Sequence, residues 1–178
     1  HHQPGRLVDD DHVGIVVQDG QRQVFGLERG GRQRRHLHVD DIPGAQHRVR
    51  LRRRHSEQRH AAVVDEPLHL LFYSTAQEIP GASFPRTLIH AGEQSQATIV
   101  ESFAGDADAV YLTCPVTEIV ADPAAVVDHY KFQRDSRAAF HLSGLALATA
   151  RGASVSTHSF SLGGAIVRHD IQARLSGE

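Results

Sequence analysis

Residues 116–148 read VTEIVADPAAVVDHYKFQRDSRAAFHLSGLALA, and this stretch decides the fold class. It contains three runs rich in Val, Ile, Phe and Leu, at Val116–Val120, Val126–Gln133 and Ala139–Ala148. The dipeptide Asp122-Pro123 between the first two runs is turn punctuation. Because no helical stripe of apolar residues continues through the stretch, the pattern predicts short β-strands joined by turns.

The same pattern recurs from Ala61 to the end of the chain. The further runs are Leu68–Tyr73, Thr87–Ala91, Ala97–Phe103, Ser154–Ser161 and Ile166–Leu175. Strands at such regular spacing fit a sandwich, a barrel or a β-solenoid. Asn-Gly and Asp-Gly hairpin turns are absent between the runs, which disfavours tightly joined antiparallel pairs and leaves a parallel β-helix, although no strict repeat period is visible. We predict an all-β fold for residues 61–178.

Two of the runs show how polar and apolar side chains would alternate along the strands. The apolar face of Ile166–Leu175 carries Val167, Ile171, Ala173 and Leu175 with His169 among them, and this face is expected to be core. In Val126–Gln133, one set is largely polar and comprises Val127, His129, Lys131 and Gln133. Val126, Tyr130 and Phe132 share the opposite face with Asp128, which the turn at the strand start is expected to keep partly hydrated.

Residues 1–60 differ from the rest in composition and charge. They hold 12 Arg and no Lys against 8 acidic residues, a sum of +4, whereas residues 61–178 sum to −6, which together give the net −2. Only short runs such as His12–Val17 and Gln23–Leu27 fit strands. We therefore predict an irregular or disordered segment of no recognisable fold over residues 1–60, followed by one all-β domain over residues 61–178.

The run Arg48–Arg54 places five arginines in seven residues, and three interpretations of it stay open. Clustered guanidinium groups could contact nucleic-acid phosphates, but no aromatic interleaving and no binding motif accompany them, so we predict no nucleic-acid partner. The run could equally be a solvated charged tail. Thirdly, residues 1–60 could be a translation of the wrong frame or strand of a GC-rich gene, because a Lys-free, Arg- and His-rich composition without periodicity is typical of such a translation.

Several classes of protein are excluded by simple counts. With Cys114 as the single cysteine no internal disulfide can form, which suits a reducing cytoplasm. The longest nearly apolar stretches, Leu68–Tyr73 and Leu142–Ala150, fall far short of the ~20 residues that span a bilayer, so we expect no membrane partner. The sequence has no Met and opens with His1-His2, which predicts a fragment or a processed piece.

One segment carries a family resemblance. Residues Val127–Ser136, VDHYKFQRDS, followed by Ala139-Phe140-His141, resemble the signature DHYK-x-QR-x-S...AFH of the SufB/SufD family. Six further segments resemble motifs of that family in the same order: Glu66–Phe72, Pro85–Ile89, Thr98–Phe103, Val116–Val120, Thr157–Gly164 and Val167–Ile171. The match covers residues 61–178 and is nearer SufD than SufB. It departs from the family at Cys114-Pro115, where Asn-Ala is usual, and at His169, where Asn is usual.

The resemblance implies a right-handed parallel β-helix, here partial because family members are considerably longer. It also implies a cytoplasmic scaffold without enzymatic activity that works with a SufB-type paralogue and a SufC-type ABC ATPase. Iron-sulfur clusters are built on that complex, and we expect none to be bound by this chain alone. The alternatives are a plain structural β-solenoid and a β-helix carbohydrate-active enzyme, which would need clustered carboxylates and aromatic platforms in a chain with no Trp and three Tyr.

Cysteine and histidine side chains are the candidates for metal or sulfur chemistry. Cys114 could ligate iron or carry sulfur as a thiolate, but one thiol cannot hold a cluster that usually takes four, so we predict an inert cysteine at a strand end. His129, His141 and His158 could supply imidazole to a metal. No partner stands at ligand spacing beside them, and we predict surface or turn-stabilising histidines.

Two further features have simple structural interpretations. His169 lies on an apolar strand face, which predicts a core histidine bonded to the backbone across neighbouring coils. Gly163-Gly164 lacks the Gly-Lys-Ser or Gly-x-Gly-x-x-Gly pattern of a phosphate loop and predicts a corner turn. The sequence assigns no catalytic residue, and it leaves the residues that touch iron, sulfide or a flavin unassigned.

Overall fold

The computed structural model describes residues 13–19, 22–26, 63–76 and 78–177, the first two ranges as backbone only. Every regular element in these ranges is a β-strand, which confirms the all-β prediction. In chain order the strands are β1 (Val13–Asp19), β2 (Arg22–Gly26), β3 (Leu68–Ser74), β4 (Gly81–Ser83), β5 (Pro85–Ala91), β6 (Gln96–Gly105), β7 (Tyr111–Thr113), β8 (Val116–Ala121), β9 (Val126–Arg134), β10 (Phe140–Thr149), β11 (Ser154–Ser161) and β12 (Ile166–Leu175). The described residues contain no helix that could cross a membrane.

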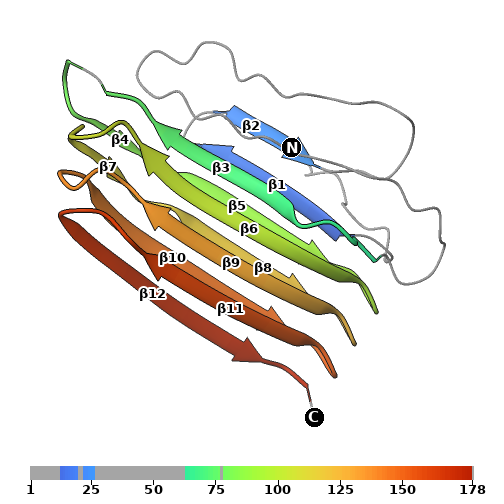
Figure 1. Cartoon of the computed structure of the whole chain (residues 1–178). Coiled ribbons are helices and arrows are strands. Elements are labelled where there is room, and N and C mark those ends of the chain that lie inside the picture. The colour runs from blue at the N-terminus through green and yellow to red at the C-terminus, as the bar shows by residue number, and fades with distance from the viewer. Residues whose placement is uncertain (1–12, 20–21, 27–62, 77, 178) are drawn as a thin grey trace, which may run out of the picture.

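The strands form two facing sheets, and the chain passes from one to the other along its length (Figure 1). The first, sheet A, has the order β2-β1-β5-β8-β10-β7-β4, with β12 paired to β10. The second, sheet B, has the order β11-β9-β6-β3. Strands β3 to β12 pair with one another only in parallel, between successive coils. They therefore wind as the coils of a parallel β-helix, as predicted.

The coils repeat every 26 to 31 residues, although the sequence shows no matching repeat. Leu68 pairs with Ile99, Gln96 with Val126, and Val126 with Ser154, which are separations of 31, 30 and 28 residues. In the last coil Phe140 pairs with Ile166, a separation of 26 residues. A separation that shortens by one or two residues from coil to coil leaves no fixed period for a sequence comparison to detect.

One corner of the β-helix uses the same turn in successive coils. Gln94, Ala124 and Gly152 have positive φ angles of 56°, 57° and 68°. The turns stack, because the N–H of Gln94 donates to the carbonyl of Pro123 and the N–H of Ala124 donates to the carbonyl of Arg151, both at 3.0 Å. Of the three residues only glycine adopts this conformation without a Cβ penalty. Backbone geometry, and not a shared residue type, therefore carries the structural repeat.

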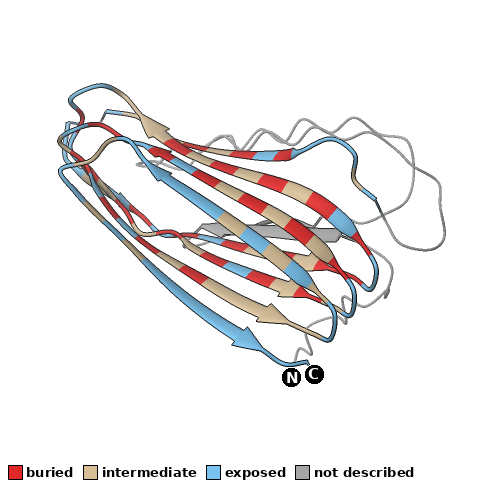
Figure 2. Cartoon of the chain, turned by 60° about the horizontal axis from the view of Figure 1, so that its bottom comes forward, coloured by how far each residue is buried: buried red, intermediate tan, exposed pale blue. Residues whose placement is uncertain are grey.

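In strands β3 to β10, alternate residues point into the space between the sheets and form the core (Figure 2). The inward apolar side chains meet in one cluster, whose fully buried members include Leu70, Ile89, Ile99, Ile119 and Val127. Burial of a side chain of this size stabilises a fold by about 1.5–3 kcal/mol. This apolar cluster holds sheet A against sheet B.

Strand β9 places its polar set inside the β-helix. His129 is 1% exposed, Lys131 4% and Gln133 0%, whereas Phe132 on the opposite face is 37% exposed. Residue polarity alone would put the charged side chains outside. The reverse arrangement is possible because polar groups on neighbouring strands pair with them, as described below.

Strand β12 shows the predicted alternation, but its apolar face is not covered. Ile171 is 51% exposed and Leu175 is 79% exposed. Figure 2 shows β12 as the most exposed strand of the β-helix. The expectation that this face is core is therefore wrong for the described structure, because β12 pairs with β10 and no described strand packs on its other side.

Two strands come from the Arg-rich first segment. β1 and β2 form an antiparallel pair, and β1 also pairs antiparallel with β5 over Val13–Asp19. The two short runs in which strands seemed feasible therefore do form strands, at the edge of sheet A. The rest of residues 1–60, including Arg48–Arg54, lies outside the described residues, and the domain boundary near residue 60 stays a prediction.

Candidate functional site

Polar side chains occupy part of the interior of the β-helix, between sheets A and B. We call this set the interior network; it comprises Glu101, Tyr111, Thr117, His129, Lys131, Gln133, Asp135, His141, Ser143 and His169. All members are buried except His169, which is half-buried. Polar groups are costly to bury unless they are paired, and clusters of buried titratable groups are concentrated at functional sites. The network is therefore the candidate functional site.

The network begins with a carboxylate in an otherwise apolar row. The inward residues of β6 are Ala97, Ile99, Glu101 and Phe103. His129 Nε2 lies 3.0 Å from Glu101 Oε2, and the hydroxyl of Thr117 donates to both carboxylate oxygens at 3.1 and 2.9 Å. The other ring nitrogen of His129 lies 3.1 Å from Thr157 Oγ1 on β11. One histidine thus links strands β6, β9 and β11.

These contacts keep Glu101 ionised. Burial would raise the pKa of this carboxyl, but the hydrogen bonds from His129, Thr117 and Thr87 outweigh burial and lower the pKa below its ordinary value. The interior therefore holds a negative charge, which the adjacent cation on β9 partly balances.

That cation is Lys131, which stands beside Glu101 in the register of β6 and β9. Its ammonium group donates to the hydroxyl of Ser143 on β10 and lies 5.3 Å from the centre of the Phe103 ring. Ser143 Oγ is also 2.8 Å from Nδ1 of His169 on β12. The amine, the hydroxyl and the imidazole form a chain that runs from sheet B to sheet A.

Burial makes both ends of this chain less basic. It lowers the pKa of Lys131 to about 8, against the opposing attraction of Glu101 and Asp135. Burial together with the positive charge of Lys131 lowers the pKa of His169 to about 4. Near neutral pH, His169 is therefore neutral. Of the three linked groups, Lys131 is the one whose pKa lies close enough to neutral pH to exchange a proton.

The third part of the network surrounds Asp135, at the corner between β9 and β10. Its carboxylate accepts hydrogen bonds from the Tyr111 hydroxyl at 2.9 Å and the Gln133 amide at 2.8 Å. His141 Nδ1 lies 2.9 Å from Asp135 Oδ2, and the two side chains form an electrostatic pair. The hydroxyl of Tyr111 in turn accepts from the N–H of Ser136 at 3.1 Å.

The charge state of this part follows from its partners. Burial would raise the pKa of Asp135, but His141 and Gln133 outweigh it and the pKa is lowered. Burial lowers the pKa of His141, although Asp135 opposes the shift. Burial is also the main reason why the pKa of Tyr111 is raised. Asp135 is therefore anionic and Tyr111 a neutral donor at ordinary pH.

The predicted histidines fall into two groups. His129 and His141 are 1% and 0% exposed, so the prediction of a surface position is wrong for both, although His141 contacts Asp135 at a corner. They are buried because Glu101 and Asp135 supply the partners that a single-strand pattern does not reveal. His158 is exposed, as predicted, and stacks on Tyr130 with ring centres 4.9 Å apart on the outer face of sheet B. His169 makes the predicted bond across coils, but its partner is the side-chain hydroxyl of Ser143 and not the backbone, and His169 is half-buried instead of core.

The remaining candidates lie at corners. Cys114 stands between β7 and β8, donates its N–H to the carbonyl of Ser83 at 2.8 Å, and is not part of the interior network. Burial raises the pKa of its thiol, which disfavours the reactive thiolate.

Gly163-Gly164 form the predicted corner between β11 and β12. A Cβ on Gly163 would lie 2.2 Å from the carbonyl oxygen of Asp135, and Gly164 has a φ of +95°.

Sequence reasoning missed most of the interior network. Glu101, Asp135 and Ser143 were not singled out, and Lys131 was noted only as part of a polar strand face, because each is a common residue in a segment that looks ordinary alone. One signal was available: Glu101 interrupts the inward apolar row of β6, and His129, Lys131 and Gln133 share one face of β9. Two such rows on adjacent parallel strands indicate a paired polar interior.

The network offers paired acids and bases, not a metal centre. Among the described side chains no group of three or more His, Cys, Asp and Glu could hold a metal ion. Instead, Glu101 is matched with His129 and Asp135 with His141. The arrangement can hold or move protons and bind a small polar guest.

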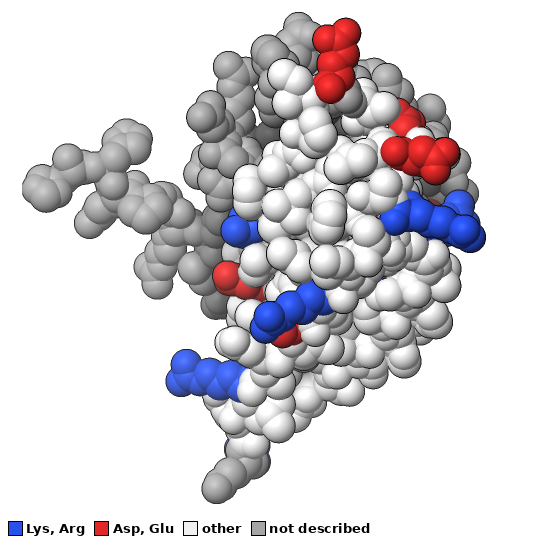
Figure 3. Space-filling model, turned by 90° about the vertical axis from the view of Figure 1, so that its left-hand side faces the viewer, with Lys and Arg blue, Asp and Glu red and all other residues white. Residues whose placement is uncertain are grey.

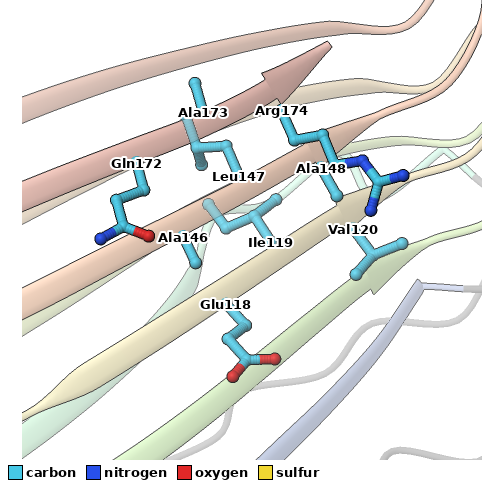
Figure 4. A pocket seen from close by; sticks show the side chains of 9 residues that line it. All are labelled: Glu118, Ile119, Val120, Ala146, Leu147, Ala148, Gln172, Ala173 and Arg174. Atoms are coloured by element: carbon cyan, nitrogen blue, oxygen red, sulfur yellow. The ribbon is translucent and has the colours of Figure 1, made fainter. Parts of the chain in front are cut away.

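The outer surface has two features near these strands. A shallow groove of about 320 Å³ crosses the outside of sheet A (Figure 4). The outward residues that line it are Glu118, Val120, Ala146, Ala148, Gln172 and Arg174. The edge at which sheet B strands end and sheet A strands begin is largely uncharged in Figure 3. Leu162 and Ile166, 66% and 55% exposed, lie at or beside the last corner of this edge.

Comparison with known families gives one match over most of the β-helix. The model described as "SUF system FeS cluster assembly, SufBD core domain" matches residues 72–178. No solved structure matches the chain significantly.

Three curated relatives match a similar part of the chain. The iron-sulfur cluster assembly SufBD family protein slr0076 of Synechocystis is 30% identical over 114 residues, which are 60% of this chain and 25% of the relative. The iron-sulfur cluster assembly protein SufD of Escherichia coli is 29% identical over 111 residues, 62% of this chain and 26% of SufD. Protein ABCI7, chloroplastic, of Arabidopsis thaliana is 27% identical over 121 residues, 64% of this chain and 25% of the relative. The chain spans about a quarter of the length of these relatives.

Proposed function

Because this chain belongs to the SufBD core family of the SUF iron-sulfur cluster assembly system, we propose that it is part of a scaffold subunit that acts in cluster assembly without catalysing a reaction. The observation that supports the proposal is that the family match and the parallel β-helix cover nearly the same residues. The family match begins at residue 72 and the parallel β-helix begins with β3 at Leu68, and both continue to the end of the described chain.

The partners we propose are a SufB-type paralogue and a SufC-type ABC ATPase, in the cytoplasm. ATP hydrolysis would belong to the ATPase, since no phosphate-loop pattern stands in this sequence. The iron-sulfur cluster is the cargo of the assembled complex, and this chain alone would bind none. Exposed apolar side chains such as Phe132, Phe160 and Leu162 support a protein that works in a complex, because such surfaces commonly mark interaction sites.

The interior network has a role within this proposal. Lys131 has a pKa near 8 and is buried beside Ser143 and His169, so its charge is costly to maintain for stability alone. We propose that the scaffold function requires the charge of Lys131. A β-helix carbohydrate-active enzyme would instead need an accessible acid pair, whereas Glu101 and Asp135 are each buried against a histidine.

Deletion of the gene in its native cell tests the scaffold role. The activities of iron-sulfur enzymes should fall, and those of enzymes without clusters should not change. The intact gene should restore the lost activities. Cluster enzymes that stay fully active in the deletion strain would contradict the proposal, and turnover of a pectin-like polymer by the purified protein would favour the carbohydrate-active alternative.

The same strain tests the interior network. Lys131→Met keeps the length of the side chain and removes the buried charge, so the fold should persist while restoration of cluster-enzyme activity is lost. Arg137→Met is the matched control, because Arg137 is an exposed cation on a nearby corner. If both variants restore activity equally, Lys131 has only a structural role.

A further inference from the structure

Six buried polar atoms among the described side chains have no hydrogen-bond partner within the protein. Nδ1 of His141 stands against the Asp135 carboxylate, and Nε2 of His169 belongs to a half-buried side chain. The other four are Ser83 Oγ, Thr113 Oγ1, Gln133 Oε1 and His141 Nε2. The four side chains are 7%, 2%, 0% and 0% exposed. Native proteins rarely leave such atoms unpaired, and each is costly when it is. Four of them together therefore require a common explanation.

Three of these residues form one column across the coils. Ser83 on β4 pairs in register with Thr113 on β7, and Thr113 pairs with His141 on β10. All three side chains point inward. Gln133 belongs to the same place, because its amide nitrogen and His141 Nδ1 both contact Asp135 Oδ2, at 2.8 and 2.9 Å.

The two hydroxyl groups of the column do not bond each other directly. Ser83 and Thr113 lie on adjacent strands, which are about 4.8 Å apart in a sheet. A water molecule between two oxygen atoms at that separation can lie about 2.8 Å from each, the normal length of an O–H···O bond. This spacing suits a single-water bridge between them.

We propose that this column binds a file of ordered water molecules inside the β-helix. One water bridges Ser83 and Thr113, and a second bridges Thr113 and His141 and donates to the amide oxygen of Gln133. The file continues the interior network across three coils, from the Asp135–His141 pair to β4. It is a binding site distinct from the scaffold role and does not depend on it.

The chemistry of the lining selects water over an ion. The carboxylate of Asp135 beside Nδ1 of His141 favours the proton on that nitrogen, which leaves Nε2 as an acceptor. Gln133 Oε1 is also an acceptor, and both would repel an anion. The neighbouring ammonium of Lys131 disfavours a cation. The two hydroxyl groups both donate and accept, so the guest must be neutral and able to do both.

The sign of a stability change tests the proposal. Thr113→Val keeps the shape of the side chain and removes the hydroxyl. If water bridges this hydroxyl, the variant leaves its neighbours unpaired, and the thermal midpoint of the 178-residue chain should fall by roughly 2–4 °C. If the column is dry, the variant removes an unpaired hydroxyl, and a midpoint that is unchanged or higher would overturn the proposal.

Two further variants and one direct measurement make the test secure. Ser83→Ala should lower the midpoint in the same direction, and an unchanged or raised midpoint counts against the file. Thr117→Val is the control, because its hydroxyl bonds Glu101 directly and its loss should lower the midpoint in either case. A crystal structure at a resolution that reveals ordered water should show a peak between Ser83 and Thr113. An empty column, or density too strong for oxygen, would refute water as the guest.

Discussion

The two halves of the β-helix interior are built by the same strands and yet differ in chemistry. Toward the corner that carries Ala124, the inward positions are aliphatic, as at Ile99 and Ile119. Toward the opposite corner most of them are polar, as at Asp135 and His141, and the stacked rings of Phe72 and Phe103 lie among them. The aliphatic half stabilises the fold in proportion to the area it buries. The polar half is tolerated only because almost every group has a specific partner.

Which face of a strand is buried in this β-helix depends on its contacts with other segments. A single strand such as β9 presents a polar face and a mixed face, and neither is marked as interior. Some partners lie in the next coil, as Glu101 does 28 residues from His129, and others lie across a corner, as Asp135 does from His141. The aliphatic side chains that stabilise the fold thus lie toward one end of the strands, and the polar network lies toward the other end.

The largest effect is expected where a partner is removed from the polar half. His129→Leu leaves the Glu101 carboxylate buried without its imidazole, and should lower the free energy of unfolding by about 3–5 kcal/mol. Denaturant unfolding of the purified chain measures the change. The double variant Glu101→Leu/His129→Leu should recover most of the loss, since two apolar residues need no partner. Equal losses in the single and double variants would show that the pair is not coupled.

The aliphatic half should respond to lost volume alone. Ile119→Ala removes a side chain that is 1% exposed and should lower the free energy of unfolding by about 3 kcal/mol. The same unfolding experiment, repeated at pH 5 and pH 7, should give the same difference because no charge is involved. A difference that depends on pH would mean that the two halves are not independent.

The pH dependence of stability should separate the halves further. Burial and the charge of Lys131 hold the pKa of His169 at about 4, below its unfolded value of 6.5. Between these values the unfolded chain binds a proton that the folded chain does not, so stability should fall as the pH drops from 6.5 to 4. The lowered pKa values of His141, Glu101 and Asp135 act in the same direction.

The variant His169→Asn isolates one of these contributions. Thermal midpoints recorded from pH 7 to pH 4 should fall less steeply for the variant than for the parent chain. The other buried groups should keep part of the slope. Parallel curves would contradict the assignment of a neutral, half-buried His169.

The smallest effect is expected on the outer face of sheet B. Phe132 and Phe160 stack with ring centres 4.8 Å apart but are 37% and 44% exposed. Phe132→Ser should therefore cost about 1 kcal/mol or less. Thermal unfolding of the isolated chain checks this. A loss as large as that of Ile119→Ala would mean that this face is covered and the division into inside and outside is wrong.

Much of the fold could be predicted from the sequence. The run Val126–Gln133 became β9 (Val126–Arg134), and the other β-type runs also coincide with strands. The short strands β4 and β7 were not predicted, because three residues carry no detectable alternation. The parallel arrangement followed from the missing hairpin turns and the family resemblance together.

The site was less predictable for a physical reason. His129 and His141 could be recognised as histidines, but their burial depends on Glu101 and Asp135, which the coil geometry brings to them. No local pattern contains that geometry. To predict these contacts one would need the register of the coils, and that register is set by turns that have the same backbone geometry but different residues.

The central claim is that this β-helix belongs to a cluster-assembly scaffold, and capture of the protein from its native cell tests it most directly. The chain, tagged in the genome and recovered under mild conditions without oxygen, should bring with it a SufB-type paralogue and a SufC-type ATPase in fixed proportion. Recovery of the chain with neither protein, under conditions in which a SufB-type and a SufC-type protein are recovered with each other, would contradict the claim.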